Sequence, residues 1–179
     1  MSIKLLIISA SPRIGGNTEL LCKEFLSGAR STDKDGEVVY LRNMNIHYCK
    51  ACEWCIKNPG ECIQTDDMSA ILDKMIKAEV IVLASPIHFN TMDARMKTFI
   101  DRTYARYKEL NNKNFYYIVT GADERKLAME RTLEEFRGFT NYLFKAKVKG
   151  IIYGTGTRNK GDIKGTRTMK QAFEMGRNI

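Results

Sequence analysis

Several common features are missing from this sequence of 179 residues, and each absence excludes a class of protein. Residues 1–13, MSIKLLIISASPR, return to charged and polar residues after a short apolar run, which fits neither a secretory signal nor a membrane span. We therefore expect a cytoplasmic protein with no membrane partner, whose five cysteines do not form a disulfide framework. No catalytic triad or pair of catalytic carboxylates is evident, so the sequence offers no obvious protein nucleophile or general base.

Two widespread phosphate-binding motifs are absent as well. The P-loop ends in Gly-Lys-Ser/Thr, and no lysine stands where the first helix is expected to begin. The dinucleotide fingerprint requires three spaced glycines, which the adjacent pair Gly15 and Gly16 does not supply. A phosphate site in this chain must therefore be of another kind.

The basic charge of the chain is concentrated near its C-terminus. The formal net charge is +8, and residues 155–179 contribute half of it, with six basic and two acidic residues. This segment lacks aromatic residues interleaved with the basic ones, as single-strand binders have them, so we expect no nucleic-acid partner. A basic tail can instead cross to another subunit or meet a phosphorylated cofactor.

Strand and helix patterns alternate along the whole chain, whose length fits one domain. Near-continuous apolar strands separated by amphipathic helices predict an α/β fold: a doubly wound sheet of five parallel strands in the order 2-1-3-4-5, with helices on both faces. We expect residues 1–154 to form this domain, with a cysteine-rich loop at 43–65. Residues 155–179 should form a basic tail or helix, either part of the same domain or part of an oligomer interface. The expected strands are residues 3–9, 37–42, 79–84, 115–120 and 148–154.

The segment SASPRIGGNT, residues 9–18, leads from the first expected strand into the first helix. Small, hydroxyl-bearing and glycine residues at such a turn leave backbone N–H groups free, and the helix dipole adds partial positive charge. This pattern predicts a site for a monophosphate, although an ordinary turn in which Asn17 caps the helix is an alternative. The candidate phosphate-binding residues are Ser9, Ser11, Arg13, Gly16, Asn17 and Thr18.

In the predicted strand order the chain reverses direction between its first and third strands, and ligands bind outside the carboxyl ends of strands at such a point. The loops at 9–17 and 85–93 should therefore line one crevice. Pro86 is expected to end the third strand and stiffen the turn, so that the following residues frame the edge of a planar ring. For His88, an ordinary half-exposed loop histidine is the alternative. The candidate ring-binding residues are Ser85, Pro86, Ile87, His88, Phe89 and Asn90, with Thr120, Gly121 and Ala122 at the exit of the fourth strand.

Four cysteines lie within the segment CKACEWCIKNPGEC, residues 49–62, at spacings of two, two and six intervening residues. Four thiols so close together in a long loop exceed what packing requires. They can ligate a 4Fe–4S cluster, while structural zinc fits the spacing less well, and free redox-active thiols are a third interpretation. The fifth, Cys22, falls in an apolar helix stripe and should be core. The candidate metal ligands are Cys49, Cys52, Cys55 and Cys62.

Taken in order, SASPRIGGNT, the cysteine segment and ASPIHFN with ARMKTFIDR resemble the flavodoxin-like NADPH-dependent FMN reductases, in particular the branch called iron–sulfur flavoproteins. The resemblance covers roughly the first two thirds of the chain. It implies a flavodoxin-like fold, FMN with its phosphate at residues 9–18, and an isoalloxazine loop at residues 85–90. Two positions depart from the family pattern: Ala10 replaces a frequent glycine, and His88 a frequent tyrosine.

These observations lead us to expect an FMN-dependent oxidoreductase that takes hydride from NAD(P)H and passes electrons to a small-molecule or protein acceptor. An FMN or iron–sulfur electron carrier without nicotinamide turnover is the first alternative. A thiol-based redox or metal sensor centred on residues 49–62 is the second. The resemblance and the basic tail also suggest a homodimer or homotetramer.

Overall fold

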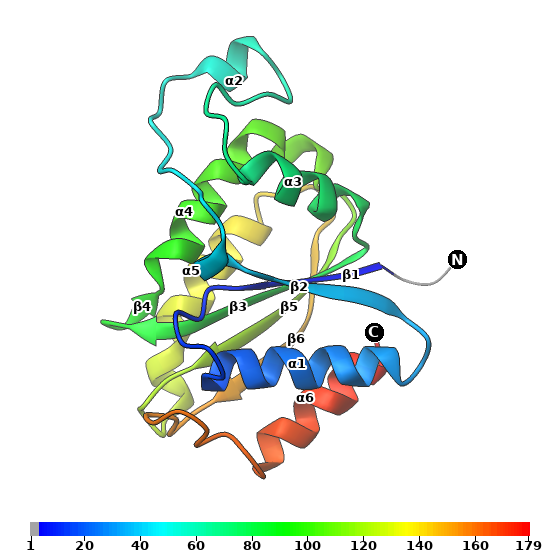
Figure 1. Cartoon of the computed structure of the whole chain (residues 1–179), viewed down its shortest axis with the longest axis vertical. Coiled ribbons are helices and arrows are strands. Elements are labelled where there is room, and N and C mark those ends of the chain that lie inside the picture. Colours follow the sequence, from blue (N-terminus) through cyan, green and yellow to red (C-terminus); the bar gives the residue numbers. More distant parts are fainter. Residues whose placement is uncertain (1–3) are drawn as a thin grey trace.

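The computed structural model describes residues 4–179, so Ile3 of the first expected strand lies outside the described residues. Within that range, five parallel strands form the central sheet in the order β2-β1-β3-β5-β6 (Figure 1). Since β5 and β6 are the fourth and fifth parallel strands along the chain, the predicted fold class and strand order are confirmed. The parallel strands are β1 (Lys4–Ser9), β2 (Asp35–Tyr40), β3 (Val80–His88), β5 (Asn114–Thr120) and β6 (Lys147–Gly154).

A short antiparallel strand, β4 (Thr91–Met92), was not expected from the sequence. It forms because β3 does not end at Pro86, as predicted, but continues to His88 and turns back on itself. The neighbouring strand β1 ends with Ser9 opposite Ala84, so Pro86 has a paired strand on one side only. The missing N–H of proline therefore costs no ladder hydrogen bond at this position.

Each central strand is buried on both faces because its alternate side chains enter two different cores. In β1, Leu6 and Ile8 pack into one cluster, while Leu5 and Ile7 pack into the other. This arrangement follows from the two-residue period of a strand and explains why β1 is apolar without alternation. Functional groups are consequently left to the ends of the strands.

Helices cover both faces of the sheet (Figure 1). None of those in the described residues is long and apolar enough to span a bilayer. A short helix, α2 (Trp54–Lys57), belongs to the cysteine-rich loop, which projects past α3 (Met68–Lys77) at the top of Figure 1. On one face lie α1 (Asn17–Arg30) and α6 (Arg167–Arg177), and on the other α3 (Met68–Lys77), α4 (Ala94–Arg102) and α5 (Glu130–Thr140); the remaining helical segments are α2 (Trp54–Lys57) and the 3-10 turns Leu41–Asn43, Thr103–Glu109 and Lys126–Met129.

Helix α6 packs directly against α1 through a reciprocal pair of glycines. A Cβ atom on Gly176 would lie 1.9 Å from the carbonyl oxygen of Phe25, and one on Gly28 would lie 1.9 Å from that of Phe173. The two backbones therefore approach more closely than any larger residue would allow. This contact fastens the C-terminal helix of the chain to the helix that follows β1.

We expect Gly176→Ala to lower the free energy of unfolding by about 1–3 kcal/mol, because the added methyl group must push the two helices apart. Gly138→Ala is the matched control, since a Cβ at this position in α5 meets nothing within 4 Å. That change should raise stability by up to about 1 kcal/mol through its better helix propensity. Urea unfolding measures both, and equal effects of the two substitutions would contradict the close helix crossing.

Candidate functional site

A cavity of about 220 Å³ lies at the carboxyl ends of the strands, where β1 and β3 lead off in opposite directions. The loop after β1, the start of α1, the ends of β3 and β5, and the loop after β6 all contribute to its wall. The two loops that the topology places at one crevice thus do meet there. The lining residues are Ser11, Pro12, Arg13, Gly16, Asn17, Thr18, Pro86, Ile87, His88, Thr120, Gly121, Ala122, Thr157 and Arg158.

The N-terminus of α1 faces this cavity without a side-chain cap. Gly16 is the N-cap residue, not Asn17, and no side chain accepts a hydrogen bond from the first turn. The first N–H groups of a helix have no partner within the helix, and its dipole adds partial positive charge at this end. A Cβ on Gly16 would lie 3.1 Å from both Ser11 Oγ and the Arg13 carbonyl oxygen, so glycine keeps this concave turn open.

The side chain of Asn17 is committed elsewhere, which is why it does not cap the helix. Its Nδ2 donates to the Asn159 carbonyl at 2.8 Å, and its Oδ1 accepts from the N–H groups of Gly161 at 3.0 Å and Ile163 at 3.3 Å. These bonds fasten the loop between β6 and α6 to the start of α1. They bring Thr157 and Arg158 to the cavity wall. Sequence reasoning missed both residues, and the basic tail was the only signal that could have pointed to them.

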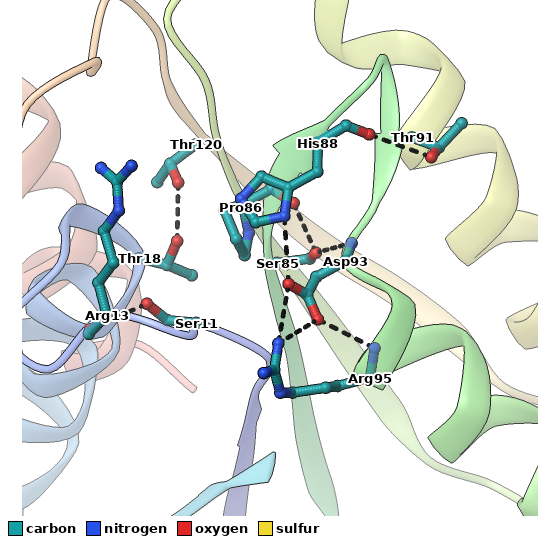
Figure 2. A network of polar contacts seen from close by, with 10 residues as sticks. All are labelled: Ser11, Arg13, Thr18, Ser85, Pro86, His88, Thr91, Asp93, Arg95 and Thr120. Atoms are coloured by element: carbon teal, nitrogen blue, oxygen red, sulfur yellow. Dashed lines mark hydrogen bonds and ion pairs between the residues drawn. The ribbon is translucent and has the colours of Figure 1, made fainter. Parts of the chain in front are cut away.

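Hydroxyl groups and arginines complete this side of the cavity, and Figure 2 shows Ser11, Arg13, Thr18 and Thr120 among them. The hydroxyls of Thr18 and Thr120 lie 2.7 Å apart and join α1 to the end of β5. The Ser11 hydroxyl donates to the Arg13 carbonyl at 3.2 Å, and the Arg13 guanidinium donates to the Arg158 carbonyl at 3.3 Å. The wall therefore combines hydroxyls, free helix N–H groups and two arginines, which suits an anionic group.

On the opposite wall, Ser85 organises the backbone and does not face the cavity. Its hydroxyl, fully buried, donates to the Pro86 carbonyl at 2.7 Å and accepts from the Asp93 N–H at 2.9 Å. Asp93 in turn caps α4 by accepting from the Arg95 N–H at 2.9 Å. Its carboxylate also lies 3.2 Å from Nδ1 of the half-exposed His88 (Figure 2). His88 is thus oriented by a buried carboxylate at the cavity rim.

Three other predicted site residues also lie away from the cavity. Ser9 is fully buried beneath the loop. Phe89 and Asn90 form the tip of the β3–β4 hairpin, both with positive φ, 47° and 65° respectively, and the Phe89 side chain is completely exposed. The hairpin carries Phe89 and Asn90 beyond the wall of this cavity. Two consecutive residues at positive φ form the kind of turn that joins antiparallel strands tightly.

A buried carboxylate supports the loop from behind. Glu19 accepts from the Gly15 N–H at 3.1 Å and forms ion pairs with Lys23 at 2.6 Å and Arg42 at 2.9 Å. Arg42 also donates to the Ser11 carbonyl at 3.3 Å. Burial opposes the charged form of Glu19, but these hydrogen bonds and nearby cations outweigh it and lower the pKa of the carboxyl. The loop is therefore held in shape before any ligand arrives.

All four cysteines of the loop line a second, larger cavity of about 800 Å³, between the loop, α4 and α5. Cys55 is half-buried; burial raises the pKa of its thiol, with smaller contributions from the charges of the other three thiols. In residues 4–179 no three histidine, cysteine or acidic side chains are grouped so that they could hold a metal ion. Cys22 lies in the core, as expected, where burial raises its pKa to about 12.

Residues 3–161 match the family described as NADPH-dependent FMN reductase. The chain belongs to this family. It is 30% identical over 180 residues to a protein named iron–sulfur flavoprotein from Archaeoglobus fulgidus, and the match covers 99% of this chain and 79% of that one. Among solved structures, it resembles an NAD(P)H:quinone oxidoreductase from Methanothermobacter marburgensis, with a TM-score of 0.73, 18% identity and 99% of each chain covered. It also resembles an FMN-dependent NADH-azoreductase from Bacillus anthracis in complex with FMN, with a TM-score of 0.71, 16% identity and coverage of 98% of this chain and 96% of that one. At these identities the structural likeness establishes the flavodoxin-like fold.

Glu19→Gln should lower the free energy of unfolding at pH 7 by about 1–3 kcal/mol, through loss of charged hydrogen bonds. Because folding lowers the pKa of Glu19, its stabilisation is fully present above the ordinary value of 4.5 and is lost as pH falls through the lowered pKa. The stability difference between the two proteins should therefore shrink on acidification. Urea unfolding from pH 7 to pH 3 measures it, with Glu24→Gln on the same helix as control. A difference that stays constant over this range would contradict the prediction.

Proposed function

We propose that this protein is an FMN-dependent oxidoreductase that takes hydride from NAD(P)H, with the FMN phosphate at the N-terminus of α1. The observation that carries the proposal is the uncapped first turn of α1, which opens into a cavity flanked by Arg13 and Arg158. A phosphate would accept hydrogen bonds from the free N–H groups and be favoured by the helix dipole. The family match supports the same cofactor.

The residues of the cavity fit the phosphate end of FMN. Gly16 leaves room for an anion to approach the backbone, and the Thr18 and Thr120 hydroxyls can accept and donate hydrogen bonds beside it. The other wall, formed by Pro86, Ile87 and His88 with the turn after β5, would hold the ring. When bound, FMN supplies the hydride and electron-transfer chemistry. The protein's part is to orient the cofactor and to set its electrostatic surroundings.

Anaerobic reduction by a nicotinamide separates this function from that of a pure electron carrier. FMN-loaded protein mixed with NADPH or NADH should lose its flavin absorbance and should turn over when a quinone acceptor is added. A carrier would remain oxidised with both nicotinamides while still accepting electrons from a chemical reductant. The acidic flavodoxins dock through a strongly charged face of one sign, whereas this chain is basic, which favours the enzyme.

Arg158→Ala should weaken FMN binding by about tenfold, because one charged contact with phosphate is lost. Arg158 is exposed, so the free energy of unfolding should not change. The control is Arg125→Ala, which removes an exposed arginine paired with Asp123 outside the cavity wall. Quenching of flavin fluorescence during titration gives both affinities. Equal affinities for the two variants would argue against a phosphate beside Arg158.

A 4Fe–4S cluster bound by Cys49, Cys52, Cys55 and Cys62 is a second proposal, favoured by the cavity that all four thiols line. Four free thiols are the donor set that such a cluster requires, and the relative from Archaeoglobus fulgidus carries the name iron–sulfur flavoprotein. A cluster would supply one-electron transfer in addition to the hydride chemistry of the flavin. Since the described residues hold no ready-made group of metal ligands, the loop must tighten around a cluster as it binds.

Cys52→Ser should abolish most of the iron and acid-labile sulfide of protein prepared without oxygen, because a four-thiolate site then lacks one ligand. Cys52 is exposed, so FMN binding and stability should be unaffected. Cys22→Ala serves as the matched control, since it removes a thiol from the core and leaves the loop intact. Zinc in place of iron, or thiols that all react with no metal present, would overturn the cluster proposal.

A further inference from the structure

Arg102, the last residue of α4, is buried where the two ends of the cysteine-rich loop meet. Its guanidinium makes a two-pronged ion pair with Asp66, with N–O distances of 2.6 Å and 3.0 Å. It also donates to the His47 carbonyl at 2.7 Å. A further N–H points to the Cys62 sulfur, with the nitrogen 3.6 Å from Sγ. One side chain therefore contacts the beginning of the loop, its end and one of its four thiols.

Asp66 also joins the two ends of the loop, through its own hydrogen bonds to the backbone. Its carboxylate, whose side chain is fully buried, accepts from the His47 N–H at 3.0 Å and from the Met68 N–H at 3.1 Å. Burial opposes the charged form of Asp66, but the bonds from Arg102 and from these two backbone groups outweigh it and lower its pKa. Residues 47 and 66 are thus held together by charge-assisted hydrogen bonds on a rigid helix end.

The charges explain why an arginine, with its several donors, suits this place. A buried ion pair gains little over apolar packing, so its value here lies in the geometry that it imposes. Asp66 balances the formal charge of Arg102. Arg102 therefore acts on the Cys62 sulfur through a directed N–H bond and not through an unpaired positive charge. Arg106, four positions further on, pairs with Asp73 and Glu109 near the surface and touches no thiol.

We infer that Arg102 is a positioning residue for the cysteine-rich loop: it locks residues 47 and 66 to α4 and holds the Cys62 sulfur through an N–H bond. The second part rests on the proposed cluster, since an N–H donor to a ligand sulfur stabilises the more negative, reduced form of a cluster. Hydrogen bonds to sulfur ligands are among the groups that set cluster reduction potentials. Arg102 would therefore raise the reduction potential of the bound cluster.

The first experiment uses metal-free protein and does not depend on the cluster. Hydrogen exchange of residues 47–66, followed by mass spectrometry, should be at least about tenfold faster in Arg102→Gln than in the unaltered protein, because a buried charge partner is lost. Arg102→Lys, which keeps the charge but not the fork of donors, should lie between them and remains informative if the glutamine variant unfolds. Arg106→Gln is the matched control and should leave the loop unchanged. Exchange in both Arg102 variants equal to that of the control would overturn the lock.

The second experiment measures the reduction potential of the reconstituted cluster, which a merely structural role would not move once iron content is equal. The Arg102→Lys protein should bind the same iron per chain but show a more negative potential, while Arg106→Gln should match the unaltered protein. An unchanged potential in Arg102→Lys would overturn the bond to Cys62 as a tuning contact. If the unaltered protein takes up no iron, the cluster proposal and the tuning role both fail, and the exchange data alone decide the lock.

Discussion

Burial of the sheet on both faces is the constraint from which the rest of the molecule follows. Since the side chains of β1 and β3 enter two cores, no reactive group can stand on a face of the sheet without displacing packing. Reactive groups are therefore left to the ends of the strands. The cavity lies at their carboxyl ends, where the chain leaves β1 and β3 in opposite directions. The position of the site is therefore a property of topology, while its chemistry depends on a few loop residues.

Those loop residues are held by contacts that are already satisfied without a ligand. Glu19 supports the turn from behind, Asn17 fastens the loop after β6, and Ser85 with Asp93 fixes the opposite wall. The first turn of α1, which faces the cavity, has no side-chain cap. A site with a rigid frame and free donors needs little rearrangement to take an anion, which is the condition for tight binding of a small group.

The parts that sequence could predict are those with a strong local pattern. The parallel strands are visible because each contains a run of apolar residues, and the start of α1 is visible because Gly15 and Gly16 follow the run in β1. The hairpin after β3 was missed, because its two tip residues, Phe89 and Asn90, adopt positive φ angles without a glycine that would indicate such a turn. The role of Asn17 was hidden for a different reason, since its partner Asn159 lies 142 residues away. Likewise, the pairing of Arg102 with Asp66 depends on the fold and leaves no trace in the spacing of either residue.

The bonds between Asn17 and residues 159–163 have a consequence for the order in which the molecule is built. The strand and turn at the start of the chain emerge from the ribosome early, yet their cavity wall is incomplete until residues near position 160 have been translated. A nascent chain therefore exposes a helix end that nothing yet encloses. A small anion that enters this cavity can therefore be enclosed only after the loop between β6 and α6 has folded back onto the start of α1.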